Sequence, residues 1–330
     1  MKKQNIVLLA ALAVMGLNVV AFSNESSTAA SVLGPGNYRI VGNASDPIII
    51  PFKMHNGKPL MSCKINGKSA ALMIDNGILW DQVWLFGSPL VKALQLKPVE
   101  EGEIRGAGEG DPTRAYTSTD LTIEFADVAF YEQPVYVSPP AAGFARMFPG
   151  TDGQLCNTFF KHFIVEFDFI NDNILLHNPE QFQHSEEGVA LDMKLNTSGT
   201  YSIPFAFTML DGKVYDDRVD IDLGGVYPLK IALNNSYKIK APVGASKTRS
   251  FGAQGMSSEY SAKIKSMTFG GYTFENPTAI FGDEGTSRIH PENLGVVGLP
   301  LFMKFRIIFD YINNKLYIEP NEDIDTPFSQ

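Results

Sequence analysis

Cysteine, clustered histidine and blocks of basic residues are all scarce in this sequence, and each absence argues against a class of protein. Two cysteines, Cys63 and Cys156, cannot make a disulfide-stapled scaffold, although one bridge between them stays open. The five histidines show no metal-ligand spacing, so we expect neither a metal site nor a cofactor. A formal net charge of −9 without a Lys/Arg block argues against nucleic acid as a partner.

The first residues have the layout of a secretory signal peptide. Lys2 and Lys3 precede an apolar run over 6–22, and the small-x-small sequence AFS at 21–23 offers a cleavage site. We therefore expect a signal peptide over 1–23 and export to the periplasm or the medium. A single N-terminal membrane anchor is the alternative. The Ser/Ala/Gly-rich residues 24–45 predict a flexible leader, and no later segment is apolar enough to span a bilayer.

Helix signals are also sparse. The best helical window, 81–96, is interrupted by Gly87 and Pro89. Short runs rich in Ile, Val, Phe and Tyr alternate with Gly, Pro, Asn and Asp through the rest of the chain, for example DPIIIPFKM, PLMSCKI, HFIVEFDF and NILLH. This pattern predicts an all-β protein built from many short strands, as a sandwich or barrels.

An internal repeat organises these strands. The segment GQLCNTFFKHFIVEFDFINDNILL (153–176) aligns without a gap to GVVGLPLFMKFRIIFDYINNKLYI (295–318). Upstream, the tripeptide IPF at 50–52 recurs at 203–205. Because several echoes keep the same order, we predict two homologous β-lobes. We place the N-terminal lobe at 46–182, a linker at 183–195 and the C-terminal lobe at 196–330.

The stretch ALMIDNGILW (71–80) can be interpreted in two ways. Asn76-Gly77 between apolar runs is a strong signal for a tight hairpin, in which Asp75 would only be a turn residue. A functional Asp75, however, predicts a counterpart in the second lobe. VDIDLGG supplies Asp222 after an equivalent strand. A tight turn does not require an acid at the same place in both copies, so the repeat favours a functional pair.

These motifs in duplicate resemble the two-lobed, pepsin-like aspartic proteases, and more closely the exported bacterial members with retroviral-protease-like lobes. In that family each lobe carries an apolar strand ending in Asp-Thr-Gly or Asp-Ser-Gly, and an apolar-apolar-Gly strand crosses behind it. The resemblance implies two β-barrel lobes with an active-site cleft between them. It implies endopeptidase activity with Asp75 and Asp222 as catalytic acids, and Gly77 and Gly224 allowing the tight path behind each acid.

The mechanism that the resemblance implies needs both lobes. Two close carboxylates share one proton, the ionised one activates a water, and the protonated one polarises the peptide carbonyl. No metal, cofactor or covalent intermediate is required. The expected partner is a peptide or protein substrate, and the expected state is a monomer.

Three positions depart from the family pattern. The hydroxyl residue between Asp and Gly is replaced by Asn76 in the first lobe and Leu223 in the second, and Leu donates no side-chain hydrogen bond. Behind the acid loops, Cys156 stands where the second lobe has Gly298. These departures keep a second hypothesis open, namely an inactive aspartic-protease-like protein that binds peptides. A structural surface protein of another class is a third.

The remaining candidates concern substrate contact and neighbouring acids. Residues 105–116 are expected to form a flap over bound peptide, with Tyr116 as a candidate for its tip, although an ordinary hairpin aromatic is the simpler interpretation. Of Trp80 and Trp84 we expect one in the cleft and one in the core. Asp220 could perturb the acid pair, because residues two apart on a strand face the same way.

Overall fold

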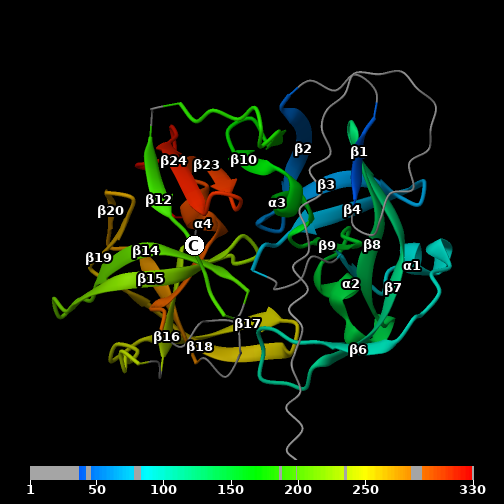
Figure 1. Cartoon of the computed structure of the whole chain (residues 1–330). Helices are drawn as coiled ribbons and strands as arrows, with labels where there is room; N and C mark the ends of the chain where they lie inside the picture. The colour runs from blue at the N-terminus through cyan, green and yellow to red at the C-terminus, as the bar shows by residue number, and fades with distance from the viewer. Residues whose placement is uncertain are drawn as a thin grey trace, which may run out of the picture. The chain divides into compact units, whose positions relative to one another are not determined.

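The computed structural model describes residues 37–41, 46–77, 83–185, 188–197, 199–233, 236–283 and 292–328. The expected signal peptide, most of the expected leader and Trp80 lie outside these residues. No helix in the described segments is long and apolar enough to cross a membrane. Strands dominate the described chain, and helices are few and short, as the sequence predicts (Figure 1).

The first sheet contains most of the N-terminal lobe. Its strands in the N-terminal half are β1 (Tyr38–Ile40), β2 (Ile48–His55), β3 (Lys58–Ile65), β4 (Lys68–Ile74), β5 (Val83–Phe86), β6 (Glu101–Ile104), β7 (Thr113–Phe125), β8 (Val128–Ser138), β9 (Gly153–Leu155), β10 (Ile164–Asp168) and β11 (Asn173–His177). Strands β3, β4, β9, β5, β8 and β7 are neighbours in that order, and β7 also pairs with β3. This extra pairing closes them into a barrel whose inward side chains form a buried core.

The second sheet belongs to the C-terminal lobe. It is built from β13 (Lys194–Leu195), β14 (Tyr201–Thr208), β15 (Val214–Asp222), β16 (Leu229–Leu233), β17 (Ser246–Gly252), β18 (Gly255–Lys263), β19 (Ser266–Phe269), β20 (Tyr272–Glu275), β21 (Thr278–Asp283) and β22 (Gly295–Gly298). Most neighbours are antiparallel, but β15 runs parallel to β22, and β16 runs parallel to β21. In this way β22 passes behind the end of β15.

Three late strands join the first sheet instead of the second. These are β12 (Val189–Asp192), β23 (Phe305–Asp310) and β24 (Lys315–Pro320), and the sheet continues in the order β12, β24, β23, β10, β11, β2. Figure 1 shows β23 and β24, in red, beside β10, in green. The exact lobe and linker boundaries stay predictions, because this sheet takes strands from both halves of the chain.

The repeat found in the sequence has a structural counterpart. The helices are α1 (Pro89–Leu94), η1 (Pro140–Ala142), α2 (Phe144–Met147), α3 (Thr158–His162) and α4 (Leu299–Phe302). The order β9, α3, β10, β11 in the first half matches β22, α4, β23, β24 in the second.

The two copies meet at Glu166. Strands β10 and β23 are antiparallel, and Glu166 pairs with Ile308, which is its own counterpart in the repeat. A pseudo-two-fold axis therefore passes through this pair and relates the two acid-bearing halves.

Asp168 and Asp310 occupy equivalent positions in the repeat, and both are turn residues. The carboxylate of Asp168 accepts the backbone N–H groups of Ile170 and Asn171, and that of Asp310 accepts the N–H of Asn313. Each acid thereby stabilises the turn after its strand. Their repetition reflects local structure and not chemistry.

Candidate active site

Parallel strand pairing places Asp75 and Asp222 at equivalent points. In the N-terminal lobe, β4 pairs with β9 up to Ile74 and Leu155, and the Asp75 N–H donates to the Leu155 carbonyl at 2.9 Å. In the other lobe, β15 pairs with β22 up to Asp222 and Gly298. Each acid thus leaves its strand where a short strand crosses behind it, which is the arrangement that the repeat predicts.

The two acid loops touch each other. An ideal Cβ placed on Gly224 would lie 2.3 Å from Asp75 Oδ2 and 2.7 Å from its Oδ1. The carboxylate of the first lobe therefore rests directly on the loop of the second, two residues from Asp222. Both acids are buried, with 6% of Asp75 and 4% of Asp222 exposed. No side chain could occupy position 224 without displacing Asp75, which explains why glycine stands there.

Asn76 joins the lobes in place of the hydroxyl residue. Its side-chain oxygen accepts the Leu223 backbone N–H at 2.8 Å, and its nitrogen donates to the Tyr311 hydroxyl at 3.0 Å. Burial raises the pKa of Tyr311, so this phenol stays neutral and able to accept. Leu223 takes part only through its backbone, and its side chain is fully buried in the core. The missing side-chain donor at 223 does not prevent an interlobe hydrogen bond.

Each carboxylate accepts a hydrogen bond from the backbone of its own loop and from a neighbouring side chain. The Gly77 N–H donates to Asp75 Oδ1 at 3.0 Å, and the Gly224 N–H donates to Asp222 Oδ1 at 2.8 Å. The second oxygens differ between the lobes. Gln154 Nε2 donates to Asp75 Oδ2, and the Tyr227 hydroxyl donates to Asp222 Oδ2, both at 3.3 Å.

The space behind the two acid loops also differs. A Cβ on Gly298 would lie 2.3 Å from the Tyr227 carbonyl oxygen, so the second lobe has no room for a side chain there. The first lobe accommodates Cys156, which is fully buried. Cys156 and Cys63 are not joined to each other, so the disulfide left open by the sequence is not formed. Burial, with a contribution from Asp152, raises the pKa of Cys63 to about 12.

A lysine reaches the acid pair from the tip of the β2–β3 hairpin. Lys58 Nζ donates to the Gly224 carbonyl, across the lobes. Gly57 beside it lies near Val226, where a Cβ would be 3.7 Å from a Val226 methyl group. The hairpin therefore contacts the same loop that supports Asp75.

Two hairpins, one from each lobe, are joined at their tips. The loop between β6 and β7 contains Gly106 and Gly110, and the tip between β17 and β18 contains Gln254. The Gln254 side chain accepts the Gly106 N–H at 3.1 Å and donates to the Gly110 carbonyl at 2.9 Å. Backbone bonds from Gly110 to Gln254 and from Gln254 to Ala107 add to the joint, both at 2.8 Å. These are the glycine-rich segments that echo each other in the sequence.

The predicted flap and pocket aromatics take different positions. Tyr116 lies within β7, opposite Glu101 and Val137, and beyond the 105–112 loop. Burial raises its pKa. The tip of that hairpin is the glycine-rich loop instead.

Trp84 is buried in β5 and donates its indole N–H to Ser138 Oγ at 3.2 Å. It belongs to a small cluster with Phe86 and Phe144, against which Phe251 of β17 packs from the other lobe. The hairpin of the second lobe is therefore anchored on aromatic residues of the first. Trp80 lies outside the described residues.

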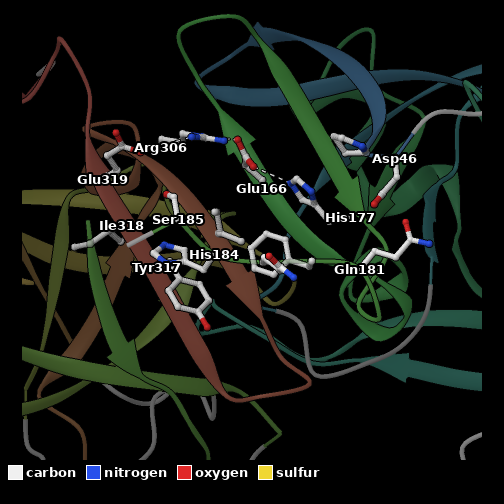
Figure 2. A pocket seen from close by; sticks show the side chains of 14 residues that line it. Asp46, Glu166, His177, Gln181, His184, Ser185, Arg306, Tyr317, Ile318 and Glu319 are labelled. Carbon is white, nitrogen blue, oxygen red and sulfur yellow. Dashed lines mark hydrogen bonds and ion pairs between the residues drawn. The ribbon is translucent and has the colours of Figure 1, made fainter. Parts of the chain in front are cut away.

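Two cavities flank these elements. One has a volume of about 780 Å³ and is lined by Tyr227, which follows the Asp222 loop, and by residues that include Tyr272, Phe274 and Phe328. The other, of about 300 Å³, lies on the sheet shared by both halves (Figure 2). The described residues contain no group of three or more His, Cys, Asp or Glu side chains that could hold a metal ion.

The smaller cavity contains a buried ion network. Figure 2 shows Glu166 at its inner wall with Arg306 on one side and His177 on the other. Glu166 Oε1 accepts Arg306 Nε, and Oε2 lies 2.8 Å from His177 Nε2. Burial alone would raise the pKa of Glu166, but the hydrogen bonds from His177 and Arg306 outweigh burial and lower it. The carboxylate at the pseudo-two-fold axis is therefore held ionised.

Sequence reasoning missed four residues at the acid pair: Lys58, Gln154, Tyr227 and Tyr311. Gln154 carried a usable signal, because a polar residue interrupts an apolar strand where the other copy has Val296. Lys58 and Tyr227 carried none, since they lie outside the aligned segments. Tyr311 lies within the repeat, where the other copy has Phe169, and it reaches the pair through Asn76.

Comparison with known proteins supports the architecture. No family model matches the sequence, and no curated protein matches it. Among solved structures, basic 7S globulin from soybean has a TM-score of 0.47 at 8% identity, covering 86% of this chain and 97% of that one. The aspartic proteinase from Irpex lacteus has a TM-score of 0.51 at 14% identity, covering 86% of this chain and 100% of that one. The chain has the two-lobed, all-β fold of the pepsin-like aspartic proteinases.

Proposed function

We propose that this protein is an exported aspartic endopeptidase that hydrolyses peptide bonds with a water activated between Asp75 and Asp222. The observation that carries the proposal is the contact of the Asp75 carboxylate with Gly224, in the loop of the second acid. Burying two carboxylates beside the same glycine costs free energy unless the two share a proton. A protein without acid chemistry does not need that arrangement. Export rests on the signal-peptide layout of residues 1–23.

In this mechanism the ionised acid takes a proton from the water as its oxygen bonds to the peptide carbonyl carbon. The protonated acid donates a hydrogen bond to the carbonyl oxygen, which becomes a hydroxyl of a tetrahedral intermediate. The acid that took the proton from water then transfers it to the peptide nitrogen, and the other acid takes a proton back from a hydroxyl of the intermediate. The C–N bond breaks, which releases an amine and a carboxylic acid and restores the one shared proton. The hydrogen bond between Asn76 and Leu223 would keep the two acids in register, and a small misplacement costs about 100-fold in rate.

A peptide-binding protein without activity is the second candidate, and Lys58 favours it. An ammonium group bound to Gly224 favours ionisation of both neighbouring acids, whereas catalysis needs one of them protonated.

Cleavage of a mixed peptide library across pH 3–8 tests both candidates. We expect cleavage by the wild type, and its loss in Asp75→Asn and in Asp222→Asn. Activity that survives either substitution would eliminate the acid pair as the catalyst. A folded wild type that binds peptides without cleaving them at any pH would establish the second candidate.

A further inference from the structure

We propose that Lys230 and Glu259 of the C-terminal lobe recognise a carboxamide side chain, that of glutamine or asparagine, in the peptide that the acid pair receives. The inference rests on the proposed function, because it takes a peptide as the ligand. It gives the site one chemically selective wall. The evidence is a difference between the two lobes at positions that the repeat makes equivalent.

The face of the N-terminal barrel next to Asp75 is apolar. Five side chains from its strands are buried together there: Met73, Trp84, Phe86, Ile104 and Ala115. Phe144 of α2 packs on this cluster, with its ring centroid 4.6 Å from that of Trp84 and 5.6 Å from that of Phe86. Aromatic residues of the protein itself therefore fill the space on this side.

The strand registers give each of these residues a counterpart in the C-terminal lobe. Trp84 of β5 lies opposite Gln154 of the crossing strand β9. Lys230 of β16 lies opposite Val296, which is the counterpart of Gln154 in β22. The counterparts of Met73, Trp84, Phe86, Ile104 and Ala115 are, in that order, Asp220, Lys230, Ala232, Ser250 and Glu259. Each apolar side chain of the cluster is thus replaced by a polar or a smaller one.

Lys230 and Glu259 form a buried ion pair, with 9% and 3% of their side chains exposed. Lys230 Nζ donates to Glu259 Oε1. The hydroxyl groups of Ser250 and Ser257 donate to the same oxygen, at 2.8 and 3.3 Å. Within the described residues these contacts all fall on Oε1, so Oε2 is left as an acceptor for a ligand. An ammonium group has three N–H donors, so Lys230 keeps donors for a ligand as well.

A carboxamide matches this arrangement because one flat group carries both an acceptor oxygen and N–H donors. Its oxygen would accept from Lys230 Nζ while its NH₂ group donates to Glu259 Oε2. Charged side chains fit less well, since a carboxylate meets the like charge of Glu259 and an ammonium meets that of Lys230. An apolar side chain would bury the remaining donors and the acceptor without partners, which costs binding free energy.

The ion pair lies close to the acid loop of its own lobe. Lys230 Nζ lies 5.7 Å from the centre of the Tyr227 ring, and the Tyr227 hydroxyl donates to Asp222 Oδ2. Tyr227 also lines the cavity of about 780 Å³. Ser261, in the same lining, lies two residues from Glu259 and on the same face of β18. A peptide bound in this cavity is therefore within reach of both the acid and the ion pair.

Isosteric peptides test the preference. In a peptide that the wild type cleaves, each residue within three of the cleaved bond is replaced in turn by Gln, Glu and Met, and by Asn, Asp and Leu. We expect one position at which a carboxamide gives a kcat/KM at least about tenfold higher than either of its isosteres. Equal rates within each set at every position would overturn the inference.

Variants of the ion pair should change which isostere is preferred. Glu259→Gln keeps the shape but leaves Lys230 beside a neutral amide, so the preference should move from the carboxamide to the carboxylate. The double variant Lys230→Met, Glu259→Leu leaves no unpaired buried charge, so it should fold and should prefer the apolar isostere. Glu101→Gln, an exposed acid on β6, is the matched control and should keep the wild-type preference. An unchanged preference in the folded pair variants, checked by circular dichroism, would overturn the inference.

Binding separates this inference from the proposed function. Should the wild type cleave nothing, the proposed function fails, and fluorescent peptides selected from the mixed library for binding to the wild type replace the substrates. We then expect the carboxamide peptide to bind at least about tenfold more tightly than its isosteres. Equal affinities, or no binding by any peptide, would overturn the inference.

Discussion

The side-chain oxygen of Asn76 accepts the backbone N–H of Leu223 at 2.8 Å, so a residue of one lobe fixes the acid loop of the other through its main chain. A backbone donor is present whatever side chain follows the acid. Leucine at 223 is therefore compatible with an ordered pair of loops, and its side chain is free to fill the core. The side chain that the interlobe hydrogen bond requires is therefore the one at position 76.

Replacing Asn76 with alanine should separate the two acids. The change removes the bonds to Leu223 and Tyr311 and leaves a buried N–H unpaired, which costs about 1–3 kcal/mol in the free energy of unfolding. We expect kcat/KM to fall about 100-fold, because the acids lose their register. Urea unfolding and peptide cleavage measure the two effects. Leu223→Met, which keeps the backbone donor and the side-chain volume, should retain activity; equal losses in both variants would contradict the role given to Asn76.

Substitution of Gly224 by alanine tests the contact between the loops. The added methyl would lie 2.3 Å from Asp75 Oδ2, so either the carboxylate or the loop must move. Cleavage should fall by at least about 100-fold, measured with the same peptides. Gly102→Ala is a fair control, since its methyl would meet side chains away from the acids, the Tyr136 ring at 3.0 Å and the Thr117 methyl at 3.9 Å. Full activity in Gly224→Ala would show that this contact does not position Asp75.

The joint between the hairpins can be weakened by Gln254→Ala. The variant removes the acceptor of the Gly106 N–H but leaves the backbone bond from Gly110 to Gln254. Amide exchange at Gly106 should accelerate roughly five- to tenfold, because one net hydrogen bond contributes about 1 kcal/mol. Gly110 serves as an internal control with a smaller change. Unaltered exchange at Gly106 would mean that its protection comes from elsewhere.

The ion network at the pseudo-two-fold axis makes stability depend on pH. The folded-state pKa of Glu166 is lowered, so its stabilisation is present above the pKa of the unfolded chain and is lost as pH falls through the folded value. Glu166→Gln should therefore lower the free energy of unfolding most at neutral pH, with the difference shrinking in strong acid. Urea unfolding at several pH values between 3 and 7 measures it. A difference that does not vary with pH would rule out the ionised carboxylate as its source.

The sequence predicted the acids far better than their surroundings. Asp75 and Asp222 were found because a repeat aligns them, and strand pairing places both at equivalent points. Repetition could not reveal Tyr227, which lies outside the aligned segments, and it marked Gln154 only as a polar residue where the other copy has Val296. Nor could it show that Leu223 acts through its backbone, since every residue except proline carries that N–H.

The sheet shared by both halves has a consequence for biosynthesis. Strand β10 pairs with β23, for example Phe167 with Ile307, and these two strands are far apart in the chain. An emerging N-terminal lobe would therefore expose the β10 edge on the ribosome for more than a hundred residues of elongation. Unpaired edges of this kind recruit other strands, so an isolated N-terminal half should need a chaperone or a second copy to remain in solution.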